Sequence, residues 1–338
     1  MSKARKVNLG VVGLGYWGPN LVRNFSEVDN CNVAMACDSA GEKLKRIEKR
    51  YPFIKTTTKY NDLISASDID AIAIATPVFS HYELARKAFE KGKHVLVEKP
   101  MCANIKEAES LIKIAAANNR ILMVDHTFLY TGSVRKMKEL ISQNELGELY
   151  YFDSVRINLG LFQPDVNVIW DLAPHDFSIA HYLIGEEPVS VSVLGKDFDN
   201  NKVACLAYIT LKFRSGIIAH IHVSWLSPVK VRRIIIGGSK KMIIYNDVEP
   251  TEKVKVYDTG IQFDYTKETP LQPTYRLGDI HLPKLEQKEA LWVEAEHFID
   301  CIIHNKKPLT DATSGLAVVK ILEACDTSLS EGGREVKL

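Results

Sequence analysis

The sequence predicts an α/β fold, with a doubly wound parallel sheet followed by a second domain built on a large, open, mostly antiparallel sheet. Three observations predict it. The chain has 338 residues, too many for one compact core. A glycine-rich turn, Gly13–Gly18, separates an apolar run from a helical stretch. After about residue 126, alternating strands and helices give way to a series of strand-like runs. We therefore expect two domains, residues 1–126 and 127–338.

The first domain is predicted to consist of repeated strand–helix units. Such units form a parallel sheet, and ligands bind such sheets at the carboxyl ends of the strands. The expected strands are 7–12, 33–37, 71–75, 94–97 and 121–124, and the expected helices include 19–25, 80–91 and 104–118, the last with Asn104 as its cap.

The glycine-rich turn has the G-x-G-x-x-G spacing of a dinucleotide site. The first glycine of such a turn makes the tight bend, the second admits a pyrophosphate, and the third packs helix against strand. The amides at the helix N-terminus then bind the phosphates. The predicted cofactor contacts in this turn are Gly13, Gly15, Tyr16, Trp17 and Gly18.

Asp38 follows the second predicted strand, twenty residues beyond Gly18. An acid at this place binds the ribose hydroxyls of adenosine and repels a 2′-phosphate. The next residues, Ser39 and Ala40, supply no arginine for such a phosphate, so we expect NAD rather than NADP. Lys43 could reach the ribose edge, which slightly weakens that preference, but its basic run is better explained as the solvated face of the next helix.

Several polar residues stand where the other strands of the first domain end. Because these ends share one edge of the sheet, we expect them near the cofactor. Lys99 is the most specific of them, since a lysine at that edge can act on a bound substrate. For His81, near a helix start, a structural or capping role is as well supported as cofactor contact. The predicted contacts are Thr76, Pro77, His81, Glu98, Lys99 and His126.

The second domain is predicted to carry one large sheet and four helices. The strand-like runs are 149–158, 188–194, 204–213, 217–224, 231–236, 242–245 and 254–257, and the helices are 133–142, 167–184, about 286–304 and 312–331. Several strands alternate apolar and polar residues, as in an antiparallel sheet with one wet face. A second copy of the chain is the simplest cover for that face, so we expect a homodimer or homotetramer assembled through this sheet.

Asp171 and His175 are four positions apart on the predicted helix 167–184, so they share one helix face. The spacing alone is equally consistent with a plain ion pair and with an acid–base pair. A metal site is disfavoured because no third ligand stands at a characteristic spacing, and we expect no metal.

Composition and charge exclude several classes of protein. The formal net charge is +1, which favours neither nucleic acid nor an anionic membrane surface as partner. No apolar run is long enough to span a bilayer, and the N-terminus lacks the pattern of a secretory signal. The six cysteines are scattered without a Cys-x-x-Cys pair, which indicates reduced thiols in a cytoplasmic protein.

Three signatures in order, the glycine-rich turn, Glu98-Lys99-Pro100 and Asp171-x-x-x-His175, resemble the glucose–fructose oxidoreductase / inositol dehydrogenase (Gfo/Idh/MocA) family over essentially the whole chain. The resemblance implies a nicotinamide-binding Rossmann domain and a second domain that binds a sugar or polyol. It also implies that Lys99 holds the reacting hydroxyl, His175 is the general acid/base and Asp171 orients the pair.

Within the family, the segments 170–176, 275–283 and 308–336 are similar to UDP-N-acetylglucosamine (or its uronic acid) 3-dehydrogenases. This similarity suggests Arg156, Asn158 and Arg276 as contacts for the diphosphate or the sugar, although each is equally well explained as a surface polar group. Three alternatives stay open: a ketoreductase for dTDP-linked sugars, a dehydrogenase for free polyols, and a non-catalytic ligand-sensing regulator.

Overall fold

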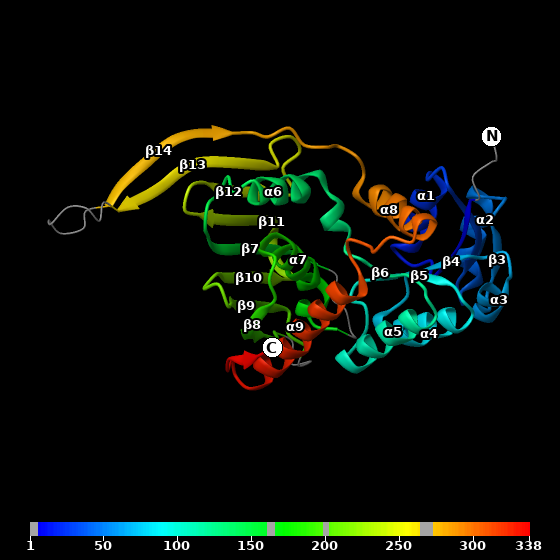
Figure 1. Cartoon of the computed structure of the whole chain (residues 1–338). Helices are drawn as coiled ribbons and strands as arrows, with labels where there is room; N and C mark the ends of the chain where they lie inside the picture. The colour runs from blue at the N-terminus through cyan, green and yellow to red at the C-terminus, as the bar shows by residue number, and fades with distance from the viewer. Residues whose placement is uncertain (1–5, 161–165, 199–202, 264–272) are drawn as a thin grey trace. The chain divides into compact units, whose positions relative to one another are not determined.

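The computed structural model describes residues 6–160, 166–198, 203–263 and 273–338. Its contacts divide the chain into two compact units. The first comprises the chain up to Tyr130 together with Lys288–Lys320, and the second comprises Thr131–Gln287 together with Ile321–Leu338. Figure 1 shows both units and the course of the chain through them. The two-part organisation agrees with the expectation, but the boundary differs because a late segment returns to the first unit.

The first unit contains the predicted parallel sheet, in the strand order β3-β2-β1-β4-β5-β6. Its strands are β1 (Val7–Val12), β2 (Cys31–Cys37), β3 (Lys55–Thr57), β4 (Ala71–Ile74), β5 (His94–Glu98) and β6 (Leu122–Asp125). Its helical segments are α1 (Gly18–Ser26), α2 (Gly41–Arg50), α3 (Tyr60–Ser65), η1 (Val78–Ser80), α4 (His81–Glu90), α5 (Ile105–Ala117), η2 (Thr127–Tyr130) and α8 (Ala290–His304). The side chain of Asn104 accepts a hydrogen bond from the amide of Glu107, so the predicted cap of α5 is confirmed.

The segment Lys288–Lys320 completes the core of the first unit. Phe298 of α8 packs edge-on against Phe25 of α1, with ring centroids 6.2 Å apart. Arg23 pairs with Glu289 at 2.6 Å. Val319 belongs to the same buried cluster as the side chains of β4, β5 and β6. A sequence pattern cannot reveal these contacts, because they join residues more than 190 positions apart.

The second unit is built on a nine-stranded sheet in the order β14-β13-β12-β11-β7-β10-β9-β8-β15, in which only the β7–β10 pair is parallel. The strands are β7 (Leu149–Leu159), β8 (Pro188–Lys196), β9 (Leu206–Phe213), β10 (Ile218–Ser224), β11 (Leu226–Gly238), β12 (Met242–Asn246), β13 (Val254–Phe263), β14 (Pro273–His281) and β15 (Val336–Lys337). The predicted mostly antiparallel sheet is therefore confirmed. Strands β13 and β14 extend beyond the neighbouring strands as an arm (Figure 1).

One face of this sheet packs against helices, chiefly α7 (Val168–Ile184), which contacts β7, β9 and β10. The remaining helices are α6 (Gly132–Ser142) and α9 (Ala312–Ser330), and α9 crosses from the first unit into the second at Lys320. Along β9, Ala207, Ile209, Leu211 and Phe213 are buried, while the alternate residues are exposed or half-buried. The alternation leaves an open face, which we define by Tyr151, Leu194, Tyr208 and Ile218.

Among the described residues, every helix is too short or too polar to span a bilayer. All six cysteines are buried thiols, as expected for small apolar side chains in a core.

Candidate active site

The glycine-rich turn in the first unit has the geometry that its spacing predicts. Gly13 adopts a φ of +88°, and a Cβ there would lie 2.4 Å from the carbonyl oxygen of Ala75. A Cβ on Gly18 would lie 1.9 Å from the carbonyl oxygen of Gly13. A Cβ on Gly15, in contrast, would meet nothing within 4 Å. The outer glycines are thus required by the protein itself, whereas the space beside Gly15 is open to a ligand.

Asp38, at the end of β2, is buried beside that turn. Its carboxylate accepts hydrogen bonds from the amides of Leu14, at 2.7 Å, and Ala40, at 2.8 Å. Lys43 Nζ lies 3.2 Å from Asp38 Oδ2. Burial disfavours the charge, but the two amides and the Lys43 ammonium outweigh it and lower the pKa of Asp38. Lys43 is therefore paired with Asp38 and is not merely part of a solvated face.

These features fit a dinucleotide. The open side of Gly15 and the N-terminus of α1 suit a pyrophosphate, and an ionised Asp38 suits ribose hydroxyls. The exposed rings of Tyr16 and Trp17 meet edge-to-face at 5.2 Å on the same turn. Within the described ranges, His, Cys, Asp and Glu side chains form no group of three or more that could hold a metal ion.

The ends of β4 and β5 are tied together by His81. Its ring is almost fully buried, with Nδ1 3.0 Å from the carbonyl oxygen of Pro100 and Nε2 2.7 Å from that of Thr76. The Thr76 hydroxyl meets that of Ser80 at 2.7 Å. Because the His81 ring faces main-chain oxygens on both sides, the structure gives it a positioning role. Of the two roles that the sequence left open for His81, the structural one fits.

Lys99 is half-buried at the end of β5 and precedes a cis proline, Pro100. The neighbouring strand ends carry Glu98, Asp125 and His126, all buried. The first unit therefore brings the predicted residues at the ends of β4, β5 and β6 to one edge of the sheet, the same edge that carries the glycine-rich turn.

In the second unit, α7 presents Asp171 and His175 from one partly exposed face, while Ala173, Pro174 and Asp176 are buried. This pattern follows from the helical period, since residues four apart share a face.

Trp225, which sequence reasoning missed, fixes the side chain of Asp171. Its indole Nε1 donates to Asp171 Oδ2 at 2.9 Å, and the side chain is almost fully buried. Its backbone is bonded to Cys205 and to Gly160, and a Cβ on Gly160 would lie 2.7 Å from the indole ring. The only sequence signal is a tryptophan directly after a strand, which is too common to be informative.

The first turn of α7 is also fixed at its N-terminus. The side chain of Asn167 accepts hydrogen bonds from the amides of Ile169 and Trp170. Asp326 of α9 accepts hydrogen bonds from Asn167 Nδ2, at 3.0 Å, and from Trp170 Nε1, at 2.7 Å. Two tryptophan–aspartate hydrogen bonds therefore hold this turn.

Arg156, predicted as a substrate contact, lies in the interior of the second unit. Its guanidinium pairs with Asp176 at 2.7 Å and 3.2 Å, and both side chains are at most 5% exposed. Ser154 also donates to Asp176, at 2.8 Å. The arrangement assigns Arg156 to anchoring α7 on β7, because a buried aspartate requires a partner for its charge.

Arg276 is placed apart from Arg156 and Asn158. It lies on the edge strand β14, separated from their strand β7 by three others. Its Nε donates to Asp258 at 3.0 Å, and its Nη2 to the carbonyl oxygen of Lys240. Within one chain, the structure therefore does not bring Arg276 together with the other two predicted substrate contacts.

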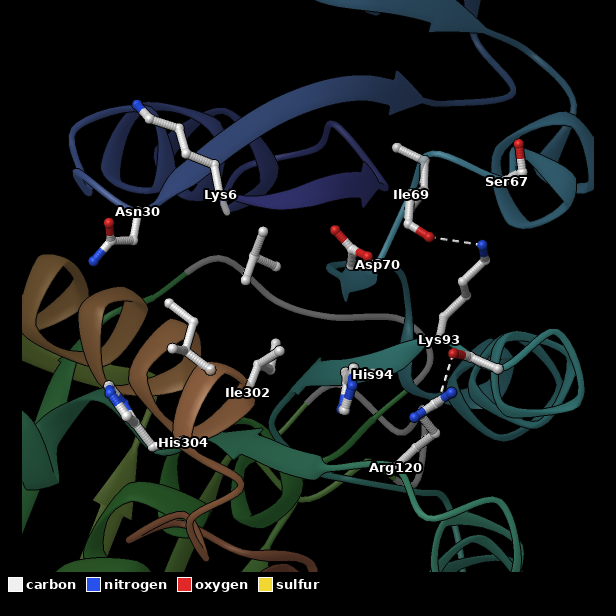
Figure 2. A pocket seen from close by; sticks show the side chains of 13 residues that line it. Lys6, Asn30, Ser67, Ile69, Asp70, Lys93, His94, Arg120, Ile302 and His304 are labelled. Atoms are coloured by element: carbon white, nitrogen blue, oxygen red, sulfur yellow. Dashed lines mark hydrogen bonds between the residues drawn. The ribbon is translucent and has the colours of Figure 1, made fainter. Parts of the chain in front are cut away.

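A cavity of about 680 Å³ lies elsewhere in the first unit, at the amino ends of β1, β4 and β5 (Figure 2). Lys93 Nζ donates there to the carbonyl oxygens of Ala66 and Ile69, and Arg120 Nε donates to that of Gly92. Both cationic side chains are therefore hydrogen-bonded to main-chain carbonyl oxygens. Since ligands of such sheets bind at the opposite edge, we place the active site at the glycine-rich turn.

Fold and site together define a nicotinamide-dependent oxidoreductase. Residues 7–126 match the model of the oxidoreductase family with an NAD-binding Rossmann fold, and residues 138–338 match the C-terminal alpha/beta domain of the same family. The chain belongs to the Gfo/Idh/MocA oxidoreductase family.

Relatives in this family act on different substrates. The chain is 25% identical to UDP-N-acetylglucosamine 3-dehydrogenase of Acidithiobacillus ferrooxidans, over 92% of this chain and 93% of the relative. It is 24% identical to scyllo-inositol 2-dehydrogenase (NAD+) of Bacillus subtilis, over 93% and 92%. An oxidoreductase from Agrobacterium radiobacter, solved with NAD+, L-tartaric acid and magnesium, has the same fold, with a TM-score of 0.82, 18% identity and 98% of each chain covered.

Proposed function

We propose that this protein is an NAD-dependent dehydrogenase that oxidises the C3 hydroxyl of a UDP-N-acetyl amino sugar to a 3-keto sugar. The observation that carries the reaction type is the presence of Lys99 at the cofactor edge, together with Asp171 and His175 on the partly exposed face of α7. The substrate class is supported by the A. ferrooxidans relative. A 3-keto product of this kind could be transaminated during the synthesis of surface polysaccharide or lipid sugars.

In the proposed reaction, the glycine-rich turn and Asp38 would hold NAD, which would supply the hydride acceptor for the substrate carbon. Lys99 holds the reacting hydroxyl, and its ammonium stabilises the alkoxide character that develops there. His175 accepts the hydroxyl proton, since imidazole titrates near neutral pH. Asp171 orients His175 and is itself held by Trp225. Thr76, Pro77, Glu98 and His126 line the cofactor in this proposal.

A second candidate is a dehydrogenase for a free polyol, which the inositol dehydrogenase relative favours. A ketoreductase for dTDP-linked sugars would be expected to prefer NADPH, and the carboxylate of Asp38 disfavours that cofactor. The presence of Lys99, Asp171 and His175 argues against a non-catalytic regulator.

The experiment is to incubate the purified protein with NAD and a panel of UDP-N-acetyl sugars, dTDP-sugars and free polyols. A 2-oxoacid is included in parallel samples, so that tightly held NADH can be reoxidised. We expect NADH or a keto-sugar only with the UDP-amino sugars. Turnover of a free polyol alone would support the second candidate, and no turnover of any compound would overturn the proposal.

Two variants test the roles of the residues. We expect Lys99→Met and His175→Asn each to lower kcat by roughly 10²- to 10⁴-fold. Lys91→Met is the matched control, because Lys91 is exposed on the same unit, and it should keep full activity. A Lys99→Met enzyme with normal turnover would contradict the mechanism.

We also propose that the protein is a homodimer or homotetramer that buries the open face of the second unit's sheet. Leu194, Tyr208 and Ile218 expose 63%, 44% and 49% of their surface on that face. Exposed apolar side chains of this kind on an uncovered sheet face favour an interface.

A further inference from the structure

Three carboxyl groups are buried together in the first unit. Glu98 ends β5, Asp125 ends β6, and Glu294 lies on α8. They are 9%, 3% and 0% exposed. Burial of even one carboxylate is costly, so three in contact require a specific arrangement of protons.

Asp125 stands in the middle of this group. Glu98 and Asp125 are partners in the parallel register of β5 and β6, so their side chains leave the sheet on the same side. Asp125 is hydrogen-bonded to the side chain of Glu98 and to that of Glu294. The Thr127 hydroxyl donates to Asp125 Oδ1. Because a carboxylate is only an acceptor, each carboxyl–carboxyl bond requires a proton on one of its members.

The direction of the pKa shifts favours the outer two members as the holders of those protons. Burial, together with the neighbouring Asp125, raises the pKa of both Glu98 and Glu294 well above the ordinary range. The Lys99 ammonium acts in the opposite direction on Glu98 without reversing the shift.

The remaining polar groups around Glu294 come from η2, from α8 and from the turn between α8 and α9. Thr127 and Tyr130 belong to η2, Thr310 bonds the Tyr130 hydroxyl at 3.1 Å, and His297 of α8 packs on the Tyr130 ring at 5.6 Å. Burial raises the pKa of Tyr130, and the nearby Glu294 adds to that effect. Both oxygens of Glu294 are buried, and the hydroxyl of Thr127, which lies beside them, donates its single proton to Asp125 instead. The proton in its bond with Asp125 must therefore come from the carboxyl groups themselves.

We propose that Glu294 is a positioning residue for the oxidation: through Asp125 it holds Glu98, the neighbour of Lys99, as a neutral hydrogen-bond donor at the cofactor edge. A charged Glu98 would attract the adjacent ammonium and compete with the substrate hydroxyl for it. A neutral Glu98 leaves the Lys99 charge to act on the developing alkoxide. The inference rests on the proposed function for its catalytic consequence, but the protonation state of the three carboxyls does not depend on it.

The first test measures protonation without substrate. Infrared spectra of the full-length protein at neutral pH should contain the carbonyl stretch of protonated carboxylic acids. That band should lose intensity in Glu294→Gln and in Glu98→Gln. If no such band is present, or if it is unchanged in both variants, the inference is overturned even when the enzyme turns over its sugar. If the sugar assay fails while the band behaves as described, only the proposed substrate is wrong.

The second test separates positioning from packing. Glu294→Gln keeps a neutral donor toward Asp125, so its kcat should stay within about threefold of the native value. Glu294→Leu removes that donor, and we expect kcat to fall roughly 10- to 100-fold with little change in substrate KM.

The matched control is Glu296→Leu, because Glu296 lies on the exposed side of the same helix. This variant should keep the native kcat. Thermal unfolding of each variant establishes that it is folded. Equal losses in the Gln and Leu variants, or none in either, would contradict the proposed role of Glu294 as a neutral donor.

Discussion

A single indole N–H fixes the acid of the proposed acid–base pair. Trp225 donates to Asp171 from a side chain that is almost completely buried, and its backbone is bonded on both sides. A preorganised carboxylate loses less freedom when His175 becomes charged during the reaction. The bond joins residues 54 positions apart.

We predict that Trp225→Phe lowers kcat by about tenfold while leaving the affinity for NAD unchanged. The ring is kept, and only the hydrogen bond to a charged group is removed. Steady-state kinetics and an NAD titration measure both effects. Trp170→Phe, which removes the equivalent bond to Asp326 on the same turn, is the control and should affect stability more than kcat. A Trp225→Phe enzyme with native kcat would show that Asp171 needs no such support.

The sequence could identify a residue when its role depends on a fixed spacing along the chain. Gly13, Gly18 and Asp38 were predictable because a strand–turn–helix unit requires them at fixed spacing. Trp225, Glu294 and the pairing of Arg156 with Asp176 were not, because no fixed spacing along the chain marks these contacts. His81 was left open for the same reason, since nothing local shows that Thr76 and Pro100 face its ring.

At the scale of elements, α7 is held against β7 by a buried ion pair. Arg156 and Asp176 are at most 5% exposed, and Ser154 adds a third hydrogen bond. Because His175 directly precedes Asp176, the ion pair also sets the position of the proposed general base along the sheet.

We expect Arg156→Met to lower the free energy of unfolding by about 3 to 5 kcal/mol, because it leaves the Asp176 charge buried without its partner. The double variant Arg156→Met/Asp176→Leu should recover most of that loss, since it removes both charges. Chemical denaturation measures both. If Arg156→Met keeps the native stability and only raises the substrate KM, the result would instead support the prediction that Arg156 contacts the substrate.

Long regular strands and helices were predicted well, whereas strands that are very short or exposed on both faces were missed. Strands β1, β5 and β7 and helices α5 and α7 follow their predicted ranges closely. Strand β3 has only three residues. Strand β14 is exposed along almost its entire length, so it lacks the apolar alternation that marks a half-buried strand.

At the scale of the whole molecule, the open face of the second unit's sheet is the proposed contact between copies. We predict that Tyr208→Glu shifts the protein toward the monomer, because the charge would be buried in that contact. Size-exclusion chromatography with light scattering measures the mass. Phe53→Glu, an equivalent change at an exposed phenylalanine of the first unit, should leave the mass unaltered. If neither the native protein nor the variant exceeds the monomer mass, the proposed assembly is wrong.

The return of Lys288–Lys320 to the first unit also affects the order in which the two units fold during translation. All six strands of the first sheet lie before Tyr130, yet Phe298, Glu294 and Val319 of its interior are translated much later. Domains commonly fold in turn from the N-terminus as the chain emerges from the ribosome. Here the unit whose strands are made first must wait for residues that are translated after the sheet of the second unit. Protease resistance of ribosome-bound chains is expected to appear only once residue 320 has emerged, so that both units reach their final form almost together.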